Sequence, residues 1–319
     1  MQQVILDVDT GIDDALALML AVRHPGVNLR AVTCVAGNAS LEQVVRNTLM
    51  VLDAAGAGPV PVAAGANRPL LADAHPAAHV HGMDGLADLG LPASSRQVVP
   101  VHAVELLRRE ILASPTPVTL VPLAPLTNIA LLVRMHPEVL TNVERIVFMG
   151  GSASVGNATA VAEFNTWHDP EAAEIVLTAG VPITMYGLDV FYAVTVAPAD
   201  ITALAASAEP GTQLVGRLLQ HLVTVKGGEV RVAGEGHGDI GDAGAVCAAL
   251  DPEGLTTMNL PVRVSLADPL TRGQTVVDHR TAGHEQDGAA DAGFRRIDVA
   301  LGVDGARYAQ LFVETISSP

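Results

Sequence analysis

The sequence predicts an α/β fold: a single domain over residues 1–319, with a mostly parallel, Rossmann-like open central sheet flanked by helices and a helical cap region. Short apolar runs alternate with longer helical stretches through the first half of the chain. Hydrophobic residues make up 49% of the chain and charged residues only 16%, which is enough for a large aliphatic core. No internal repeat or linker divides the chain. Parallel strands joined by helical crossovers place such an alternation in one sheet.

The first elements follow one another without a gap. Residues 3–8 form an apolar run closed by aspartates, which predicts a strand, and a helix follows at once over 12–23. That helix is apolar on nearly every side, which indicates burial against the sheet. The next predicted elements are a strand at 29–35, a helix at 41–55 that ends at Gly56, and a strand at 60–63.

The same alternation continues to residue 187. The predicted elements are a helix from about 101 to 112, a strand at 118–121, a helix that begins near 126, a strand at 146–149, a helix at 170–178 and a strand at 183–187.

Two segments interrupt this order. Residues 67–100 contain Pro, Gly and His without a period, which predicts a functional loop. Residues 197–241 are helical with polar interruptions and are expected to form the cap over the site. Towards the end, 261–266 and 275–277 are predicted strands, 279–293 an exposed loop, and 307–316 a closing helix.

Charge and cysteine content exclude several classes of protein. Eighteen Lys and Arg against 34 Asp and Glu give a net charge of −16 and a pI near 4.9. Such a surface repels phosphate backbones and anionic lipid, so neither nucleic acid nor a membrane is an expected partner. Cys34 and Cys247 stand alone, which favours a reducing, cytoplasmic setting. The apolar run at 15–22 lacks a basic leader and is not a signal peptide.

The segment DVDTGIDD, residues 7–14, carries the strongest chemical signal. Asp7 and Asp9 share a face at a strand end, and Asp13 and Asp14 fall in the first turn of the next helix. Unless some of them are protonated, carboxylates packed this closely need a cation, and oxygen ligands alone favour Ca²⁺ or Mg²⁺. Two alternatives remain open at this point: simple capping of the helix, and a phosphotransferase of the haloacid dehalogenase type. Gly11 stands where that phosphotransferase family has Thr, so the second likeness is superficial.

Further motifs decide between these alternatives. The segment GNATAVAEFN, residues 156–165, brings together Asn157, Glu163 and Asn165, whose side chains suit the hydroxyls of a sugar. Together with DVDTGIDDA, GN at 37–38, HGMDGL at 81–86 and PLTNIAL at 125–131, it closely resembles the inosine-uridine nucleoside hydrolase family. The likeness runs from residue 4 to about 190 and resumes at 242–252.

The resemblance implies a role for each matching residue. Members of that family bind Ca²⁺ and hydrolyse the N-glycosidic bond of ribonucleosides. The implied metal ligands are Asp9, Asp14, the backbone carbonyl of Leu123, and Asp242. Asp9 is also the implied general base. The implied substrate-binding residues are Asp13, Asn38 (near the nucleophilic water), Met149 (through its backbone), Asn157, Glu163 and Asn165.

One position departs from the family pattern. Many members carry a His before the distal aspartate that protonates the departing base, and others carry an aromatic residue, but this chain has Gly241. His237 or Asp239 could act as the acid instead, although both also suit an ordinary loop. His81 matches a substrate-side His, and a structural His is the alternative. A zinc site from His75, His79 and His81 is a weaker hypothesis.

Base recognition and assembly are the remaining expectations. Phe164 and Trp167 are candidates for stacking on the base, with a core position as the alternative for Trp167. The expected activity is Ca²⁺-dependent ribonucleoside hydrolysis in nucleoside salvage. The alternative is a catalytically impaired nucleoside- or ribose-binding protein that keeps the pocket. The resemblance also implies a homo-oligomer, a dimer or tetramer.

Overall fold

A computed structural model of the chain describes residues 1–76, 82, 84–226, 236–280 and 293–318. Within these residues, one sheet has nine strands in the order β10-β9-β11-β6-β5-β4-β1-β2-β3, and two short strands, β7 and β8, pair separately. The strands are β1 (Gln2–Val8), β2 (Val27–Cys34), β3 (Val62–Ala64), β4 (Val118–Pro122), β5 (Val143–Met149), β6 (Ile183–Tyr186), β7 (Thr195–Val196), β8 (Gly238–Asp239), β9 (Leu255–Val264), β10 (Thr275–Val277) and β11 (Arg295–Val303).

Helices connect and cover these strands. They are α1 (Ile12–Arg23), α2 (Leu41–Ala54), α4 (Ala103–Ala113), α5 (Thr127–Met135), α6 (Phe164–His168), α7 (Pro170–Leu177), α8 (Leu188–Phe191), α9 (Pro198–Ala205), α10 (Pro210–Lys226), α11 (Ala243–Leu250) and α12 (Gly305–Ser317), with short 3-10 helices η1 (Pro137–Asn142) and η2 (Pro252–Gly254).

Most of the sheet is parallel. Every neighbouring pair from β3 to β11 along the sheet runs parallel, and only β9 and β10 are antiparallel to their neighbours. A parallel pair needs a crossover connection, and the helices between the strands supply it. The predicted fold class is confirmed.

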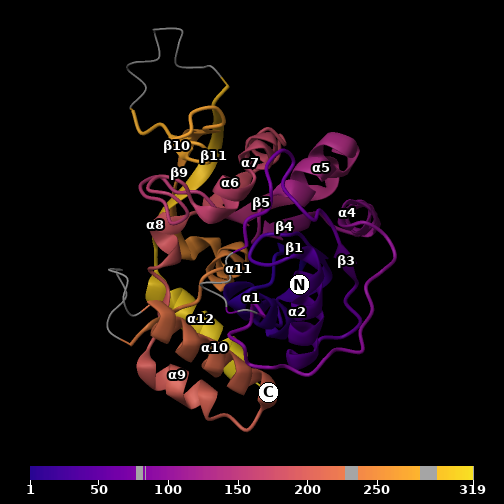
Figure 1. The fold of residues 1–319 in the computed structure, drawn as a ribbon, viewed down its shortest axis with the longest axis vertical. Helices are drawn as coiled ribbons and strands as arrows, with labels where there is room; N and C mark the ends of the chain where they lie inside the picture. Colours follow the sequence, from indigo (N-terminus) through magenta and orange to yellow (C-terminus); the bar gives the residue numbers. More distant parts are fainter. Residues whose placement is uncertain (77–81, 83, 227–235, 281–292, 319) are drawn as a thin grey trace.

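The two faces of the sheet carry separate cores. Val4, Leu6 and Val8 of β1 pack with α1, α2, α11 and α12, whereas Ile5 packs with α4, α5 and α7. This alternation follows from the two-residue period of a strand. Because α1 is buried between β1 and further helices, its nearly all-round apolar sequence is accounted for. Figure 1 shows α9 and α10 at one end of the molecule and β9 and β10 at the other.

The C-terminal part of the sheet differs most from expectation. β11 lies between β6 and β9 and has no counterpart among the predicted strands. It begins with the exposed Arg295 and Arg296, and Asp298 lies between the buried Ile297 and Val299, so no uninterrupted apolar run marks the start of this strand. β9 begins at Leu255, six residues before the predicted start. Its first half is largely exposed, and the sequence therefore shows no sign of a buried strand there. The prediction was therefore wrong where strands are only partly buried.

The helices α9 and α10 occupy the predicted helical segment. Residues 227–235 of that segment lie outside the described residues, and its role as a cap stays a prediction. Arg23, at the end of α1, donates hydrogen bonds to Thr212 Oγ1 (2.8 Å) in α10 and to the carbonyl of Ile316 (2.9 Å) in α12. These bonds connect the first turn of α10 to α1, the helix that begins at the acidic motif. No helix among the described residues combines the length and the apolar character that crossing a bilayer requires.

Candidate active site

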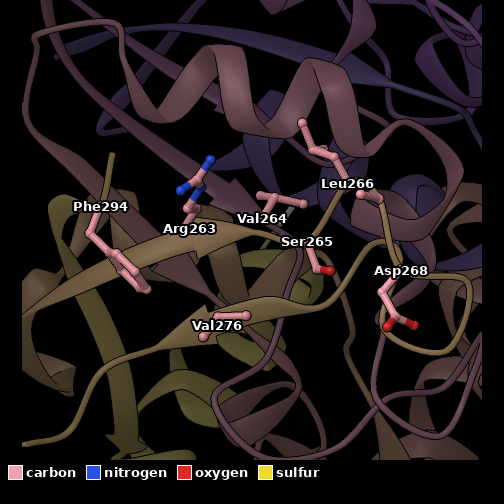
Figure 2. A pocket seen from close by; sticks show the side chains of 8 residues that line it. Arg263, Val264, Ser265, Leu266, Asp268, Val276 and Phe294 are labelled. Atoms are coloured by element: carbon pink, nitrogen blue, oxygen red, sulfur yellow. The ribbon is translucent and has the colours of Figure 1, made fainter. Parts of the chain in front are cut away.

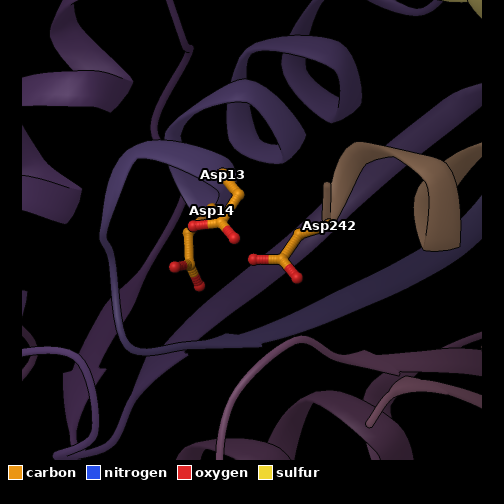
Figure 3. Close-up of side chains that lie close together, drawn as sticks. All are labelled: Asp13, Asp14 and Asp242. Atoms are coloured by element: carbon orange, nitrogen blue, oxygen red, sulfur yellow. The ribbon is translucent and has the colours of Figure 1, made fainter. Parts of the chain in front are cut away.

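Three carboxylates from distant parts of the chain meet at the carboxyl end of β1. Asp13 and Asp14 lie in the first turn of α1, and Asp242 is the N-cap residue of α11. One oxygen from each carboxylate lies within 4.8 Å of the others. Figure 3 shows the Asp242 side chain directed toward the start of α1. The structure thus brings together Asp14 and Asp242, two expected metal ligands from opposite ends of the chain, and adds Asp13 to them.

Asp14 is held by the backbone of its own loop. Its Oδ1 accepts a hydrogen bond from the Asp9 amide (3.1 Å) and its Oδ2 accepts one from the Gly11 amide (2.9 Å). A carboxylate that accepts from the N-cap backbone stabilises the start of a helix, so the capping interpretation is also realised. Burial, followed by the charge of Asp13, raises the pKa of Asp14 to about 7.

Asp9 lies beside Asp14 and is held by Asn38. The Asn38 amide donates to Asp9 Oδ2 (2.7 Å), and the Asn38 side-chain amide donates to Asp9 Oδ1 (3.2 Å). A β-carbon at Gly37 would lie 2.0 Å from Asp9 Oδ2, so only glycine allows this approach. Burial, followed by the charge of Asp14, raises the pKa of Asp9 well above its usual value.

This buried negative charge calls for a counter-charge. Among the ion pairs of the described residues, none involves Asp9, Asp14 or Asp242. Burial, followed by the charges of Asp13 and Asp14, raises the pKa of Asp242. A divalent cation would relieve this repulsion, and a donor set made of oxygen atoms fits Ca²⁺ or Mg²⁺.

The carbonyls of Leu123 and Met149 are joined by one side chain. Asn165 Nδ2 donates to the carbonyl of Leu123 (3.0 Å), which follows β4, and to the carbonyl of Met149 (3.1 Å), which ends the neighbouring strand β5. A carbonyl oxygen has a second lone pair, so the Leu123 carbonyl can accept from Asn165 and still serve a cation. Asn165 is itself buried.

Glu163 organises the segment that carries Asn165. Its Oε1 accepts from the Asn165 amide (2.8 Å), and its Oε2 accepts from the amides of Gly151 (2.9 Å) and Thr166 (3.1 Å). Glu163 is therefore the N-cap of α6, and burial raises its pKa to about 7. Asn157 is exposed and uses its Oδ1 to accept from the Phe164 amide (2.8 Å). The structure places Glu163 and Asn165 in one network and Asn157 at its outer edge.

The aromatic candidates form a cluster around α6. Phe164 contacts Trp167 (ring centroids 6.1 Å apart) and His168 (5.5 Å), and Trp167 contacts His75 (5.2 Å). A β-carbon at Gly273 would lie 2.5 Å from the Trp167 Cα, so the segment before β10 packs directly on this residue. Phe164 and Trp167 are both partly buried in these contacts, and their role in base stacking stays a prediction.

The candidates for the leaving-group acid lie in or beside β8. Asp239 is buried in β8, and His237 precedes it with a buried Nδ1 that has no hydrogen-bond partner within the described structure. Gly241 has φ +52°, and a β-carbon there would fall 2.6 Å from the Asp13 Cβ. Unless Asp13 shifts, position 241 therefore has no space for the His or aromatic side chain that the family resemblance implies there. His81 and His79 lie outside the described residues.

Asp7, which was expected to join the acidic cluster, bonds elsewhere, and two further buried polar residues, His168 and Asp169, were not among the candidates. Asp7 turns to Thr33 and Asn128, accepting from Thr33 Oγ1 (2.6 Å) and Asn128 Nδ2 (2.8 Å), so its partners differ from those of Asp9. His168 Nε2 accepts from the His75 amide (3.2 Å), and Asp169 Oδ2 accepts from the Leu70 amide (2.9 Å). Asp169 before Pro170 is an N-cap signal in the sequence, but nothing local indicates that these side chains hold the segment 70–75.

A separate surface cavity of about 340 Å³ opens beside β9 and β10 (Figure 2). Its lining shares no residue with the acidic cluster. The lining residues are Arg263, Val264, Ser265, Leu266, Ala267, Asp268, Val276 and Phe294.

Comparison with known proteins gives one consistent result. The profile of the family described as "Inosine-uridine preferring nucleoside hydrolase" matches residues 4–310. The chain is 39% identical to "Pyrimidine-specific ribonucleoside hydrolase RihA" of Shewanella sp. (strain MR-7), over 98% of this chain and 96% of that protein. It is 40% identical to the "Inosine-uridine preferring nucleoside hydrolase" of Leishmania major, over 88% of each chain.

Solved structures agree with the sequence relatives. The fold matches "Plant nucleoside hydrolase - PpNRh1 enzyme" with a TM-score of 0.92 and 29% identity, over 100% of this chain and 99% of that one. It matches "Purine-Preferring Ribonucleoside Hydrolase from Gardnerella vaginalis" with a TM-score of 0.86 and 30% identity, over 99% and 98% of the two chains.

Proposed function

The chain belongs to the inosine-uridine preferring nucleoside hydrolase family, and we propose on that basis that it hydrolyses the N-glycosidic bond of ribonucleosides in a Ca²⁺-dependent reaction. One observation carries this proposal: the carboxylates of the partly buried Asp13 and the buried Asp14 and Asp242 lie within 4.8 Å of one another, beside the raised-pKa carboxylate of Asp9. The substrate is a small-molecule ribonucleoside, and the products are ribose and the free base.

The cation is held by oxygen atoms of this chain. Asp9, Asp14, Asp242 and the Leu123 carbonyl are the proposed ligands, and the Asp13 carboxylate borders the same site. Asp13 and Asp14 are adjacent on a helix and point about 100° apart, so one can serve the sugar while the other serves the cation. A Ca²⁺ ion held by these residues would supply a lower pKa for a nearby water and a binding point for ribose hydroxyls.

Asp9 is the proposed general base. The water oxygen forms the new bond to C1′, the bond from C1′ to the base nitrogen breaks with its electron pair leaving on the base, and Asp9 accepts the water proton. A general base must be ionised, and a bound divalent cation would offset the effect of burial and of Asp14, which otherwise raise the Asp9 pKa. The positive charge that develops on the ribose is stabilised by the neighbouring carboxylates.

Ribose is held by the remaining candidates. Asp13, Asn157, Glu163 and Asn165 offer acceptors and donors for hydroxyls, Asn38 orients Asp9, and the Met149 carbonyl lies in the same network. The departing base requires a proton. The proposed sources of this proton are His237, Asp239, His81 and solvent. Phe164 and Trp167 are proposed to contact the base side.

A nonhydrolytic nucleoside- or ribose-binding protein is the second candidate, and Gly241 favours it. The position that supplies the acid in relatives has no side chain and no space for one. Isothermal calorimetry that detects nucleoside binding without release of ribose supports this candidate and contradicts hydrolysis.

A substrate panel tests the main proposal. Purified protein is assayed for ribose release from purine and pyrimidine ribonucleosides, with Ca²⁺ and with a chelator. Both base classes belong in the panel because the relatives' names include pyrimidine-specific and purine-preferring enzymes. Release that depends on Ca²⁺ supports the proposal, and absence of release from every nucleoside contradicts it.

Setting and assembly complete the proposal. Both cysteines, Cys34 and Cys247, are free and buried, which suits a reducing compartment. We therefore place the protein in the cytoplasm, in nucleoside salvage. A homo-oligomer, either a dimer or a tetramer, is proposed from the family likeness and is tested by light scattering.

A further inference from the structure

Asn47 joins two segments that flank the proposed site. It lies in α2, is fully buried, and uses one side-chain nitrogen for two backbone carbonyls. Asn47 Nδ2 donates to the carbonyl of Thr10 (3.0 Å), inside the acidic loop, and to the carbonyl of Asp84 (2.9 Å), inside the HGMDGL segment. These two segments are 74 residues apart in sequence but share a single amide group.

The surroundings fix the orientation of that amide. Gln43 Nε2 donates to Asn47 Oδ1 (2.9 Å) and also to the Asp84 carbonyl (3.2 Å). A β-carbon at Gly85 would lie 2.8 Å from Asn47 Nδ2, and Gly85 has φ +79°, so glycine is required for this approach. The segment beyond is a compact turn, because Asp84 Oδ1 accepts from the amides of Leu86 (2.7 Å) and Asp88 (2.9 Å).

The bond to Thr10 reaches a proposed metal ligand through one peptide group. The carbonyl of Thr10 and the amide of Gly11 belong to the same planar unit, and in a trans peptide they point in opposite directions. The carbonyl points to Asn47, and the Gly11 amide donates to Asp14 Oδ2 (2.9 Å). Holding the carbonyl therefore sets the direction of the hydrogen bond that holds the Asp14 carboxylate.

We infer that Asn47 is a positioning residue that couples the Asp9–Asp14 loop to the segment 84–88. Its side-chain amide bonds only to groups of the protein, and it acts through the Thr10–Gly11 peptide on Asp14 and through the Asp84 carbonyl on residues 84–88. The catalytic meaning of this coupling rests on the proposed function, but the coupling itself is a property of the chain. Groups that orient metal ligands in this way typically change metal affinity by about 10–100-fold when they are lost.

The test compares Asn47→Leu and Asn47→Asp with Thr48→Val. Both Asn47 variants keep the size of the side chain and remove its donors. Thr48→Val removes a buried hydroxyl from the same helix that contacts the Thr10 hydroxyl (2.6 Å), but it leaves both carbonyl bonds in place. Hydrogen–deuterium exchange is measured at an equal distance below each variant's melting temperature, so a general loss of stability cancels.

The expected result is joint release of both segments. In the Asn47 variants, exchange of peptides covering 9–14 and 84–89 becomes about tenfold faster, and Thr48→Val leaves both segments close to wild type. Calorimetric titration with CaCl₂ alone shows about tenfold weaker binding in the Asn47 variants, which recover their kcat at saturating Ca²⁺.

Two results overturn the inference. In the first, 84–89 exchanges faster in the Asn47 variants while 9–14 matches Thr48→Val, which makes Asn47 an anchor of one loop only. In the second, Ca²⁺ binds the Asn47 variants as tightly as it binds Thr48→Val. A wild-type protein that hydrolyses no nucleoside but shows the joint release removes the proposed function and leaves the coupling standing.

Discussion

The backbone of Gly241 lies against the side chain of Asp13, so closely that a β-carbon at 241 would fall 2.6 Å from the Asp13 Cβ and 3.1 Å from the ring of Phe191. The glycine also has φ +52°, in the left-handed region. The absence of a side chain before Asp242 is therefore a packing requirement of this chain. A His introduced at 241 cannot take the place of the acid that the family resemblance implies there without displacing Asp13.

Substitution of Gly241 is expected to damage both stability and turnover. Gly241→Ala should lower the free energy of unfolding by about 1–3 kcal/mol, from the left-handed backbone and the contact with Asp13. Gly180→Ala is the matched control, because Gly180 has φ +76° but open space around it. Urea unfolding and ribose release are measured for both variants. The additional loss in Gly241→Ala, relative to Gly180→Ala, is the effect of the contact with Asp13. Equal losses in both variants, or higher activity in Gly241→His, would show that the contact is unimportant.

Asp9→Asn should nearly abolish hydrolysis without unfolding the protein. Loss of the base is expected to lower kcat by about 10²–10⁴-fold. Because burial already raises the Asp9 pKa, the neutral amide should keep the melting temperature near wild type or above it. Asp7→Asn is the control: Asp7 is a buried carboxylate on β1, the strand that ends just before Asp9, and its pKa is raised to about 7, but it bonds to Thr33 and Asn128. Unchanged activity in Asp9→Asn would remove Asp9 as the base.

Calcium should stabilise the folded protein through Asp242. At a free concentration about 100 times Kd, a ligand that binds only the folded state adds roughly 2.7 kcal/mol. Differential scanning calorimetry with CaCl₂ and with chelator should show a higher melting temperature with the ion. Asp242→Asn should remove the shift, because it takes a carboxylate from the buried cluster. A shift of the same size in that variant would exclude Asp242 as a ligand.

The source of the leaving-group proton can be separated by substrate chemistry. A riboside with 4-nitrophenolate as leaving group needs little protonation, whereas a nucleoside base does. If His237 or Asp239 is the acid, His237→Ala or Asp239→Asn should slow nucleoside hydrolysis by about 10²-fold or more and spare the nitrophenyl riboside. If the variants hydrolyse both the nucleoside and the nitrophenyl riboside as fast as wild type does, His81 or solvent becomes the candidate source of the proton.

His168 should make stability depend on pH in the acid range. Burial, followed by the nearby His75, lowers the His168 pKa from 6.5 to about 4. Between these values the unfolded chain binds a proton that the folded protein does not, so stability falls as the pH falls from 6.5 to 4. Wild type should lose about 3 kcal/mol more than His168→Phe over this range in urea unfolding, since Phe keeps a ring beside Phe164. Parallel curves for the two proteins would contradict the shift.

Local signals account for what could be predicted from the sequence. The first strand and helix were expected almost at their observed bounds, because an apolar run ending in aspartates and followed by an apolar helix needs no distant partner to be interpreted. Asp14 and Asp242 were placed in one site by family likeness, and the structure brings their carboxylates together.

What the sequence did not predict depends on distances between remote segments. β11 is identified as a strand only by its pairing with β6 and β9. The contact of Gly241 with Asp13, the bonds of Asn47 to two carbonyls, and the bond of His168 to the His75 amide all join residues far apart in sequence. A side chain that recognises backbone leaves no residue pattern at the position that it recognises, so such bonds appear only once the chain is folded.

The position of β11 also bears on how the protein can be shortened. β6 and β9 both precede β11 in the sequence, but they do not pair with each other in the sheet. β11 lies between them and pairs with both. A chain cut before residue 295 would present two bare strand edges, each offering unpaired amides and carbonyls to another molecule. Fragments and nascent chains that stop short of this strand are thus exposed to self-association, and fusion partners or tags should be placed where they leave it free to insert.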